Sequence, residues 1–268
     1  MKHKKLLVAA MATVTALVGA LSFAACGDND DKKEEIPLTS QTDFTALVSE
    51  KVDENGWKKA FALKDYDVNF SNDMTVVGKH KEERYKDESY TVKYNINELF
   101  YKGTLNEDGD TLVFEASIKK DKDETISYYY YDYNESEGLI QKTPKKDDNT
   151  DTYKEMNDLY NFYHVMYCPD FSAQFSKFTY DETKHSYVSD NTTGTKLFET
   201  FNDDGTPQMN NYKDVEIKIV NGRLAYIVCE SVDSTANYNE YTIVSKFYDF
   251  GKTAITYKDV EEVTEMPE

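Results

Sequence analysis

The feature that most constrains the fold is an alternation of apolar and polar residues with a period of two. It recurs over residues 66–70, 90–96, 112–118 and 126–130. Successive side chains on a strand point to opposite faces of a sheet, so this alternation predicts half-buried strands. Because turn residues separate the segments, we expect an antiparallel meander, followed by later strands over 240–248 and 252–257.

A hairpin is predicted at Asn221-Gly222, which is the strongest short-range turn signal in the chain. A two-residue loop places three apolar pairs on one face of the hairpin. The opposite face carries Glu216, Lys218 and Arg223 and is expected to be solvated. The expected pairs are Ile219 with Leu224, Ile217 with Tyr226, and Val215 with Val228.

Two helices are predicted between the strands. Asp53 can cap a short helix that ends near Leu63, with its buried stripe at Trp57, Ala60 and Phe61. After a polar linker over 143–151, a second helix is expected over residues 152–167.

The second helix begins at a capping-box signature formed by Thr152 and Glu155. Its apolar residues cover most of its circumference, which is typical of a helix that is buried or lies in a groove. We therefore expect an α+β fold of mainly antiparallel sheet, with one domain over residues 42–258.

The first 25 residues resemble a bacterial lipoprotein signal peptide. Lys2, Lys4 and Lys5 precede a charge-free segment that ends in Phe23-Ala24-Ala25-Cys26-Gly27. An uncleaved membrane helix and ordinary cleaved secretion are the two alternatives. The lipoprotein interpretation also accounts for a cysteine placed where the polar chain begins. It implies a signal peptide over 1–25 and lipid attachment at Cys26, hence a position on the extracytoplasmic face of the cell membrane.

The segments at the two ends of the expected domain are rich in charge. Residues 26–41 are expected to form a disordered tether, and residues 259–268 an acidic, frayed tail. Removal of residues 1–25 takes away three lysines and no acidic residue, which leaves 28 basic against 50 acidic residues and a formal charge of −22. Such a charge repels nucleic acid, so we expect no nucleic-acid partner.

No motif identifies a reaction or a cofactor. The sequence has no G-x-S-x-G elbow, no P-loop and no H-E-x-x-H signature. His164 and Cys168 lie one helical turn apart, but two ligands do not complete a metal site. Residues 104–115 approach a calcium loop, although a hairpin turn explains them better. We therefore expect neither an enzyme nor a metal site; a disulfide between Cys168 and Cys229 stays open.

Tyrosines are abundant, with 22 in the chain. On a strand, Tyr128 and Tyr130 face one way while Tyr129, Tyr131 and Tyr133 face the other. Packing explains both sets, and a tyrosine-lined groove for a sugar or a peptide is the alternative.

The layout resembles small Gram-positive lipoproteins of the LolA/LppX-like kind. The resemblance rests on the signal, the Trp57 helix, the apolar helix 152–167, and the ending VEIKIVNGRL…FGKTAIT that starts at Val215. It implies a curved half-barrel sheet with two or three helices over its concave face, where a lipid or another hydrophobic ligand can lie. The helix side chains expected to meet that ligand are Tyr153, Met156, Tyr160, Tyr163 and Met166.

The alternative to ligand binding is a non-catalytic surface module that binds a protein or a wall polymer through exposed tyrosines. This alternative predicts a patch of exposed aromatic side chains on a protein whose core has no cavity. A solute-binding protein of the ABC-transporter class fits poorly, because that class alternates strands and helices in α/β lobes.

Overall fold

A computed structural model describes ten stretches of the chain. They are residues 35–63, 69–79, 88–95, 97–107, 110–145, 150–167, 171–189, 195–201, 207–232 and 240–263. The described residues belong to a single compact unit that begins at Glu35. Cys26 lies outside the described residues, as do the signal peptide and the charged start of the expected tether.

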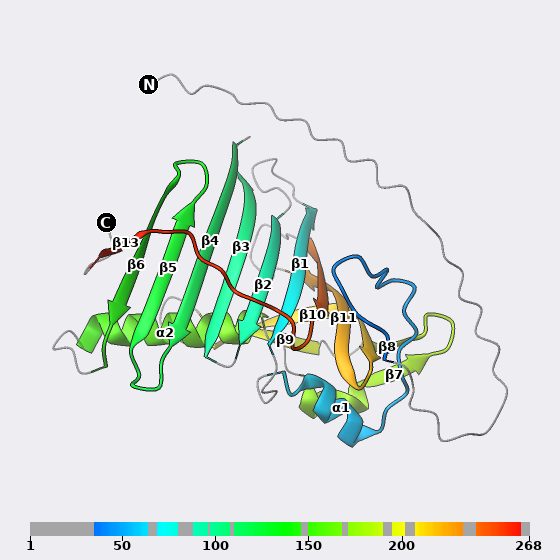
Figure 1. Cartoon of the computed structure of the whole chain (residues 1–268). Helices are drawn as coiled ribbons and strands as arrows, with labels where there is room; N and C mark the ends of the chain where they lie inside the picture. Colours follow the sequence, from blue (N-terminus) through cyan, green and yellow to red (C-terminus); the bar gives the residue numbers. More distant parts are fainter. Residues whose placement is uncertain are drawn as a thin grey trace. The chain divides into compact units, whose positions relative to one another are not determined.

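Thirteen strands lie in the described part of the chain (Figure 1). They are β1 (Phe70–Lys79), β2 (Glu88–Asn95), β3 (Glu98–Glu107), β4 (Asp110–Lys120), β5 (Ile126–Asp132), β6 (Glu137–Thr143), β7 (Phe178–Asp181), β8 (Ser186–Ser189), β9 (Thr195–Phe201), β10 (Pro207–Val220), β11 (Arg223–Val232), β12 (Glu240–Tyr248) and β13 (Glu261–Val263).

The strands form one sheet in which neighbouring strands are antiparallel, apart from a single parallel pair. The order is β13-β6-β5-β4-β3-β2-β1-β12-β11-β10-β8-β7, and β9 pairs with β10 at the side of this path. The meander from β1 to β6 confirms the predicted arrangement. The parallel pair is β13 with β6, which joins the end of the chain to the edge of the meander.

The first helix, α1 (Glu54–Phe61), matches the prediction closely. The side chain of Asp53 accepts a 2.7 Å hydrogen bond from the Gly56 amide, which caps the helix. Trp57, Ala60 and Phe61 are buried as expected. The indole of Trp57 donates a 2.9 Å hydrogen bond to the carbonyl of Phe171, next to the 3₁₀ helix η1 (Ser172–Lys177).

The second helix, α2 (Thr150–Tyr167), begins two residues before the predicted capping box. The expectation that it is buried around most of its circumference is wrong for residues 151–161, whose side chains are described. Met156 is buried there, and Tyr153, Leu159 and Tyr160 are half-buried against the core. Charged residues of the same turns, such as Lys154, are exposed, so α2 is amphipathic where its side chains are described.

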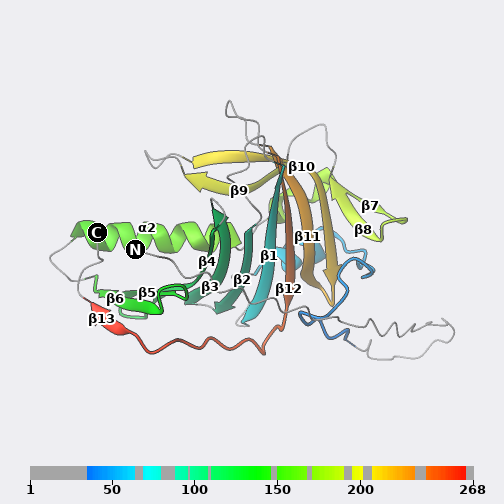
Figure 2. The ribbon, with the colours of Figure 1, turned by 90° about the horizontal axis from the view of Figure 1, so that it is seen from above.

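The two faces of the sheet are covered by different segments. One face, which we call the helix face, presents apolar side chains that join one core cluster with α1 and α2. Helix α2 contacts β4, β5 and β6, while α1 contacts β11 and η1. Figure 2 shows α2 running alongside β4, β5 and β6. In register across the sheet, the helix face carries Phe70, Tyr94, Leu99, Ile118 and Tyr128.

The opposite face is crossed by the end of the chain, which we call the C-terminal strap (residues 249–260). The predicted strand over 252–257 is wrong, because this stretch is extended but pairs with no strand. The hydroxyls of Thr253 and Ser71 lie 2.8 Å apart, and the Lys93 ammonium donates a 2.8 Å bond to the carbonyl of Ala254. Figure 1 shows the strap, in red, running across the meander to β13.

The expected frayed tail is also wrong in part. Residues Glu261–Val263 pair with Leu139–Gln141 of β6, and Glu262 forms a 2.6 Å ion pair with Lys142. The strap brings them there by lying against side chains of the sheet. A sequence pattern cannot distinguish such a crossing segment from a paired strand, since both are extended.

Three further differences concern strand boundaries and register. The alternation over 66–70 yields a strand that begins at Phe70, and residues 64–68 lie outside the described part. Strand β3 was not predicted. The hairpin pairs Ile219 with Leu224 as expected, but a bulge after Lys218 then shifts the register by one residue.

The bulge places Lys218 opposite Tyr226, on a face of the sheet that another segment covers. Lys218 is only 2% exposed, so the expectation that it is solvated is wrong. Leu38, Phe44 and Leu47 of the segment before α1 cover the same face of β10 to β12.

Candidate functional site

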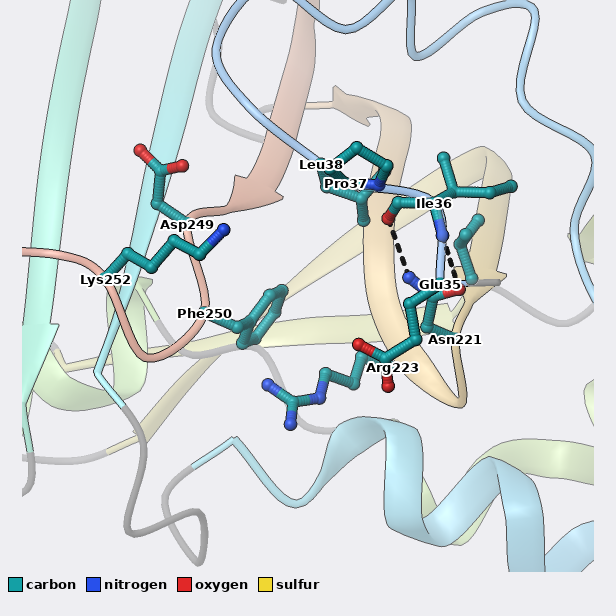
Figure 3. Close-up of a pocket in the computed structure, with 10 residues that line it drawn as sticks. Glu35, Ile36, Pro37, Leu38, Asn221, Arg223, Asp249, Phe250 and Lys252 are labelled. Atoms are coloured by element: carbon teal, nitrogen blue, oxygen red, sulfur yellow. Dashed lines mark hydrogen bonds between the residues drawn. The ribbon is translucent and has the colours of Figure 1, made fainter. Parts of the chain in front are cut away.

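A pocket of about 250 Å³ lies where three segments that are far apart in the sequence meet. One wall is the start of the described chain, residues 35–38. The second is the tip of the β10–β11 hairpin, residues 220–223, and the third is the turn from β12 into the strap, residues 249–252. Figure 3 shows these side chains around the hollow.

The hairpin tip is shaped by backbone conformations that its residues favour. Asn221 and Gly222 have φ values of 55° and 67°, which is the left-handed region that a tight two-residue turn requires. A carboxylate of Glu50 accepts hydrogen bonds from both of their amides, at 3.2 and 3.0 Å. The tip is therefore fixed to the segment that leads into α1.

The side chain of Asn221 holds the start of the described chain against this tip. Its amide donates a 2.8 Å bond to the carbonyl of Ile36 and accepts a 3.3 Å bond from the Ile36 amide (Figure 3). Leu38 is buried, and its carbonyl accepts a 3.1 Å bond from the Asp249 amide. The expected tether over 26–41 is therefore too long, because residues 36–38 are part of the packed domain.

The pocket carries two cationic and two anionic side chains around an aromatic ring. The guanidinium of Arg223 lies 4.8 Å from the ring centroid of Phe250. In Figure 3 the Lys252 amine lies on the other side of that ring, the Asp249 carboxylate points away from the ring, and the Glu35 carboxylate lies toward Arg223. The remaining lining is largely apolar, from Ile36, Pro37, Leu38 and Val220.

The candidate residues predicted on α2 lie elsewhere, beside the meander. Tyr153, Met156 and Tyr160 belong to or pack on the core cluster of the helix face. Asn157 accepts a 3.1 Å hydrogen bond from Lys120 at the end of β4. The side chains of Tyr163 and Met166 lie outside the described part, so the structure brings together three of the five predicted residues.

Sequence reasoning missed an apolar surface on the strands themselves. Leu105 and Leu112 face each other across β3 and β4, and both are half-buried against the core cluster. A Cβ added to Gly103 would lie 2.6 Å from the ring of Phe114 and 3.2 Å from that of Tyr90. Because Gly103 has no side chain, the rings of Phe114 and Tyr90 can pack directly against the backbone of β3. The signal was present in β3, where Leu99, Tyr101 and Leu105 recur on one face with a period of two, although Phe100 interrupts the alternation with polar residues.

The tyrosines of β5, and Tyr133 directly after it, are arranged as predicted on the two faces of the sheet. Tyr128 and Tyr130 pack on the helix face. Tyr133 donates a 2.5 Å hydrogen bond to the Glu115 carboxylate on the opposite face. Burial, assisted by Glu115, raises the pKa of Tyr129 to about 12.

Exposed tyrosine is scarce in the described part of the chain, where Tyr257 alone is an exposed one, at 45%. Its ring lies 4.8 Å from that of Tyr129, edge to face. The strap thus covers tyrosines that a bare sheet would present to solvent.

The described residues test the expectations about the cysteines and about metal binding only in part. Cys229 is a free thiol with no exposed surface, and burial raises its pKa. Cys168 lies outside the described residues, as does the side chain of His164. Residues Glu107 and Asp110 pair at the β3–β4 turn, as the hairpin interpretation of residues 104–115 requires. In the described ranges, no group of three or more His, Cys, Asp or Glu is placed to hold a metal ion.

No described helix combines the length and the hydropathy that crossing a membrane requires. Comparison with known proteins gives no match to a protein-family model and no match to a curated protein.

Proposed function

We propose that the protein is a lipoprotein, anchored through Cys26 on the extracytoplasmic face of the membrane, that binds a hydrophobic, lipid-like molecule without catalysis. The ligand would lie between α2 and the helix face of the sheet. In this proposal the sheet acts as a half-barrel and α2 partly covers its concave side. The resemblance to LolA/LppX-like lipoproteins points the same way.

The observation that carries the proposal is the concentration of half-buried apolar side chains on the helix face. Each packs against the core on one side and keeps exposed surface on the other. Apolar area left open in this way is what a hydrophobic ligand can bury, at about 25 cal/mol per Å². The residues on α2 and the meander are Tyr90, Leu105, Leu112, Tyr128, Tyr130, Tyr153, Leu159 and Tyr160.

In this proposal the ligand extends from α2 along the helix face toward Leu112. The midpoint of α2 meets the sheet near Lys120, where β4 ends, through the bond to Asn157. Leu112 lies near the opposite end of the same strand, about 27 Å from Lys120 at 3.4 Å per residue. The part of the helix face around Leu105 and Leu112 therefore extends beyond the helix contact.

The alternative, a surface module that uses exposed tyrosines, is less well supported. The strap covers Tyr129, and Tyr257 is the exposed tyrosine of the described residues. A single ring is a small patch for a protein or polymer interface.

The test is displacement of a fluorescent apolar probe by a long-chain fatty acid from the purified protein. We expect saturable probe binding that Leu112→Glu weakens at least tenfold, because a carboxylate on the helix face must be desolvated when the ligand binds. The matched control is Val113→Glu, which puts the same charge on the next residue of β4, facing the other side. Equal probe binding by both variants would contradict the proposal, provided that both retain the wild-type melting temperature within a few degrees.

A further inference from the structure

One cation lies at the border of the apolar helix face. The residues of β4 that belong to or pack on the core cluster are Leu112, Phe114, Ala116 and Ile118. Lys120 continues their period of two, so it is directed to the same face at the end of the strand. Its register partner on β5 is Ile126, which has no exposed surface. The lysine is therefore next to side chains that a hydrophobic ligand could contact.

The charges on the helix face are separated along the strands. In the described strands β1 to β6, the register places Lys120 as the only cation on this face. The acidic residues at helix-face positions lie at the opposite end of the meander, and they are Glu88, Asp110, Asp132 and Glu137. A ligand with one anionic end is thus attracted to the end of the face where Lys120 lies and repelled from the other end.

Lys120 has a polar partner on α2. Its ammonium donates a 3.1 Å hydrogen bond to the side-chain oxygen of Asn157. In the described part of the chain, no ion pair includes Lys120, and the amide nitrogen of Asn157 donates no hydrogen bond. The acidic neighbours of Asn157 on α2, Glu155 and Asp158, are exposed. The ammonium and the amide nitrogen thus both keep donors that no described residue accepts.

Apolar side chains continue from this polar pair. On the same side of α2 as Asn157, Met156 is buried and Tyr153 and Tyr160 are half-buried. Figure 1 shows α2 crossing β4, β5 and β6 at the end of β4 that carries Lys120. From there the helix face continues for about 27 Å along β4 to Leu112, at 3.4 Å per residue. This path is longer than an extended palmitate.

We propose that the ligand of the helix face is a long-chain carboxylate of the fatty-acid type. Its carboxylate accepts hydrogen bonds from the Lys120 ammonium and from the amide nitrogen of Asn157. Its alkyl chain runs along β4 toward Leu112. The inference rests on the proposed function, to which it adds the headgroup and the direction in which the ligand lies.

A carboxylate fits these donors better than a neutral or a doubly charged headgroup does. A hydrogen bond between a charged donor and a charged acceptor is about twice as strong as a neutral one, which favours a fatty acid over an alcohol. One lysine balances one carboxylate, whereas a phosphate monoester carries a charge of about −2 near neutral pH. The chain from Cys26 onward has a formal charge of −22, which repels that second charge.

The experiment compares palmitate with hexadecanol, which has the same chain length and no charge. Both compete with a fluorescent apolar probe for the purified full chain. We expect the wild type to bind palmitate at least tenfold more tightly than hexadecanol, and Lys120→Met should remove this preference by weakening palmitate about tenfold. Lys119→Met is the matched control and should keep the preference, because Lys119 faces the other side of β4 and pairs with Asp121 at 2.8 Å.

A second variant tests the site without removal of the lysine. In Asn157→Asp the new carboxylate should pair with Lys120 and exclude that of palmitate. The preference for palmitate should then fall about tenfold, while the affinity for hexadecanol stays as in the wild type. Lys120→Arg keeps the positive charge and should keep the preference. Melting temperatures within a few degrees of the wild type show that the variants are folded, and Asn157→Asp decides the question if Lys120→Met does not fold.

Failure of this inference differs from failure of the proposed function. Equal affinity of the wild type for the two ligands would overturn the carboxylate assignment, and so would a preference for palmitate that persists in Lys120→Met and Asn157→Asp. Either result leaves a hydrophobic site in place. If neither ligand displaces the probe, or the probe does not bind, the proposed function fails and this inference fails with it.

Discussion

The ammonium of Lys218 donates a 2.6 Å hydrogen bond to the carbonyl of Thr45, although only 2% of the lysine is exposed. The bond joins β10 to the segment that precedes α1. Burial lowers the pKa of Lys218, and the carboxylates of Glu216 and Asp43 offset this in part. The charged lysine is therefore less favourable in the folded protein than in the unfolded chain.

Lys218→Met should remove a pH-dependent cost. At pH values between the lowered pKa of Lys218 in the folded protein and its usual 10.5, the unfolded chain binds more protons than the folded protein. The free energy of unfolding of the wild type therefore increases as the pH rises through this range. At pH 7 the cost is fully present, and we expect the variant to be more stable by about 1 kcal/mol. Urea unfolding at pH 7 and pH 9.5 measures whether this advantage shrinks. Lys58→Met, measured in parallel, gives the effect of the same substitution at an exposed position of α1. A large loss of stability in Lys218→Met at pH 7 would contradict the account.

Tyr257→Ala should loosen the strap. The Tyr257 ring packs against Tyr129 and Phe100, with centroids at 4.8 and 6.0 Å, and its hydroxyl lies 3.1 Å from that of Ser117. We expect a loss of about 1–2 kcal/mol in the free energy of unfolding, measured by urea denaturation. Val48→Ala serves as the comparison, since Val48 is even more exposed, at 56%, and should change stability by less than about 0.5 kcal/mol. Equal effects of the two substitutions would show that the strap does not bear on stability.

Gly138→Ala should disturb the junction of β6 with the strap. A Cβ at this position would lie 2.6 Å from the carbonyl oxygen of Tyr130 and 2.8 Å from a methyl group of Val260. We expect faster cleavage of residues 249–263 in limited proteolysis, followed by mass spectrometry, because the strap must move aside. In Gly222→Ala the added Cβ meets no atom within 4 Å, but the φ of +67° is strained. That variant should lose about 1 kcal/mol while its strap stays protected.

Cys26→Ala should remove the lipid anchor that we propose. In a lipoprotein, two acyl chains on the cysteine would make membrane attachment durable, and the residues that follow Cys26 are mostly charged and add no apolar side chain up to Glu35. We expect metabolic labelling with a palmitate analogue to mark the wild type and not the variant. Cys229→Ala removes a buried thiol and should leave the label unchanged. Labelling of Cys26→Ala would refute lipidation at this residue.

The sequence predicted elements wherever a local signal decides the structure. Asp53 caps α1 as expected, and the Asn221-Gly222 turn pairs Ile219 with Leu224. Local sequence signals do not predict a structure that depends on contacts with a distant segment of the chain. Lys218 is buried and bonds to Thr45, which lies 173 positions earlier in the sequence, and no local pattern encodes that contact.

The candidate sites also differ in whether local sequence patterns could predict them. The side chains on α2 could be selected from their spacing, because a helix periodicity is local. The charged pocket could not be predicted, since Glu35, Arg223 and Lys252 come from three distant segments. Two of those segments lay in regions expected to be a disordered tether and a paired strand.

Native mass spectrometry of the wild-type protein, extracted from its membrane under mild conditions, tests the central claim most directly. The account predicts a co-purified hydrophobic molecule that is lost in Leu112→Glu and kept in Val113→Glu. Wild-type protein that carries no such molecule, and that takes up none when incubated with membrane lipids, would contradict it.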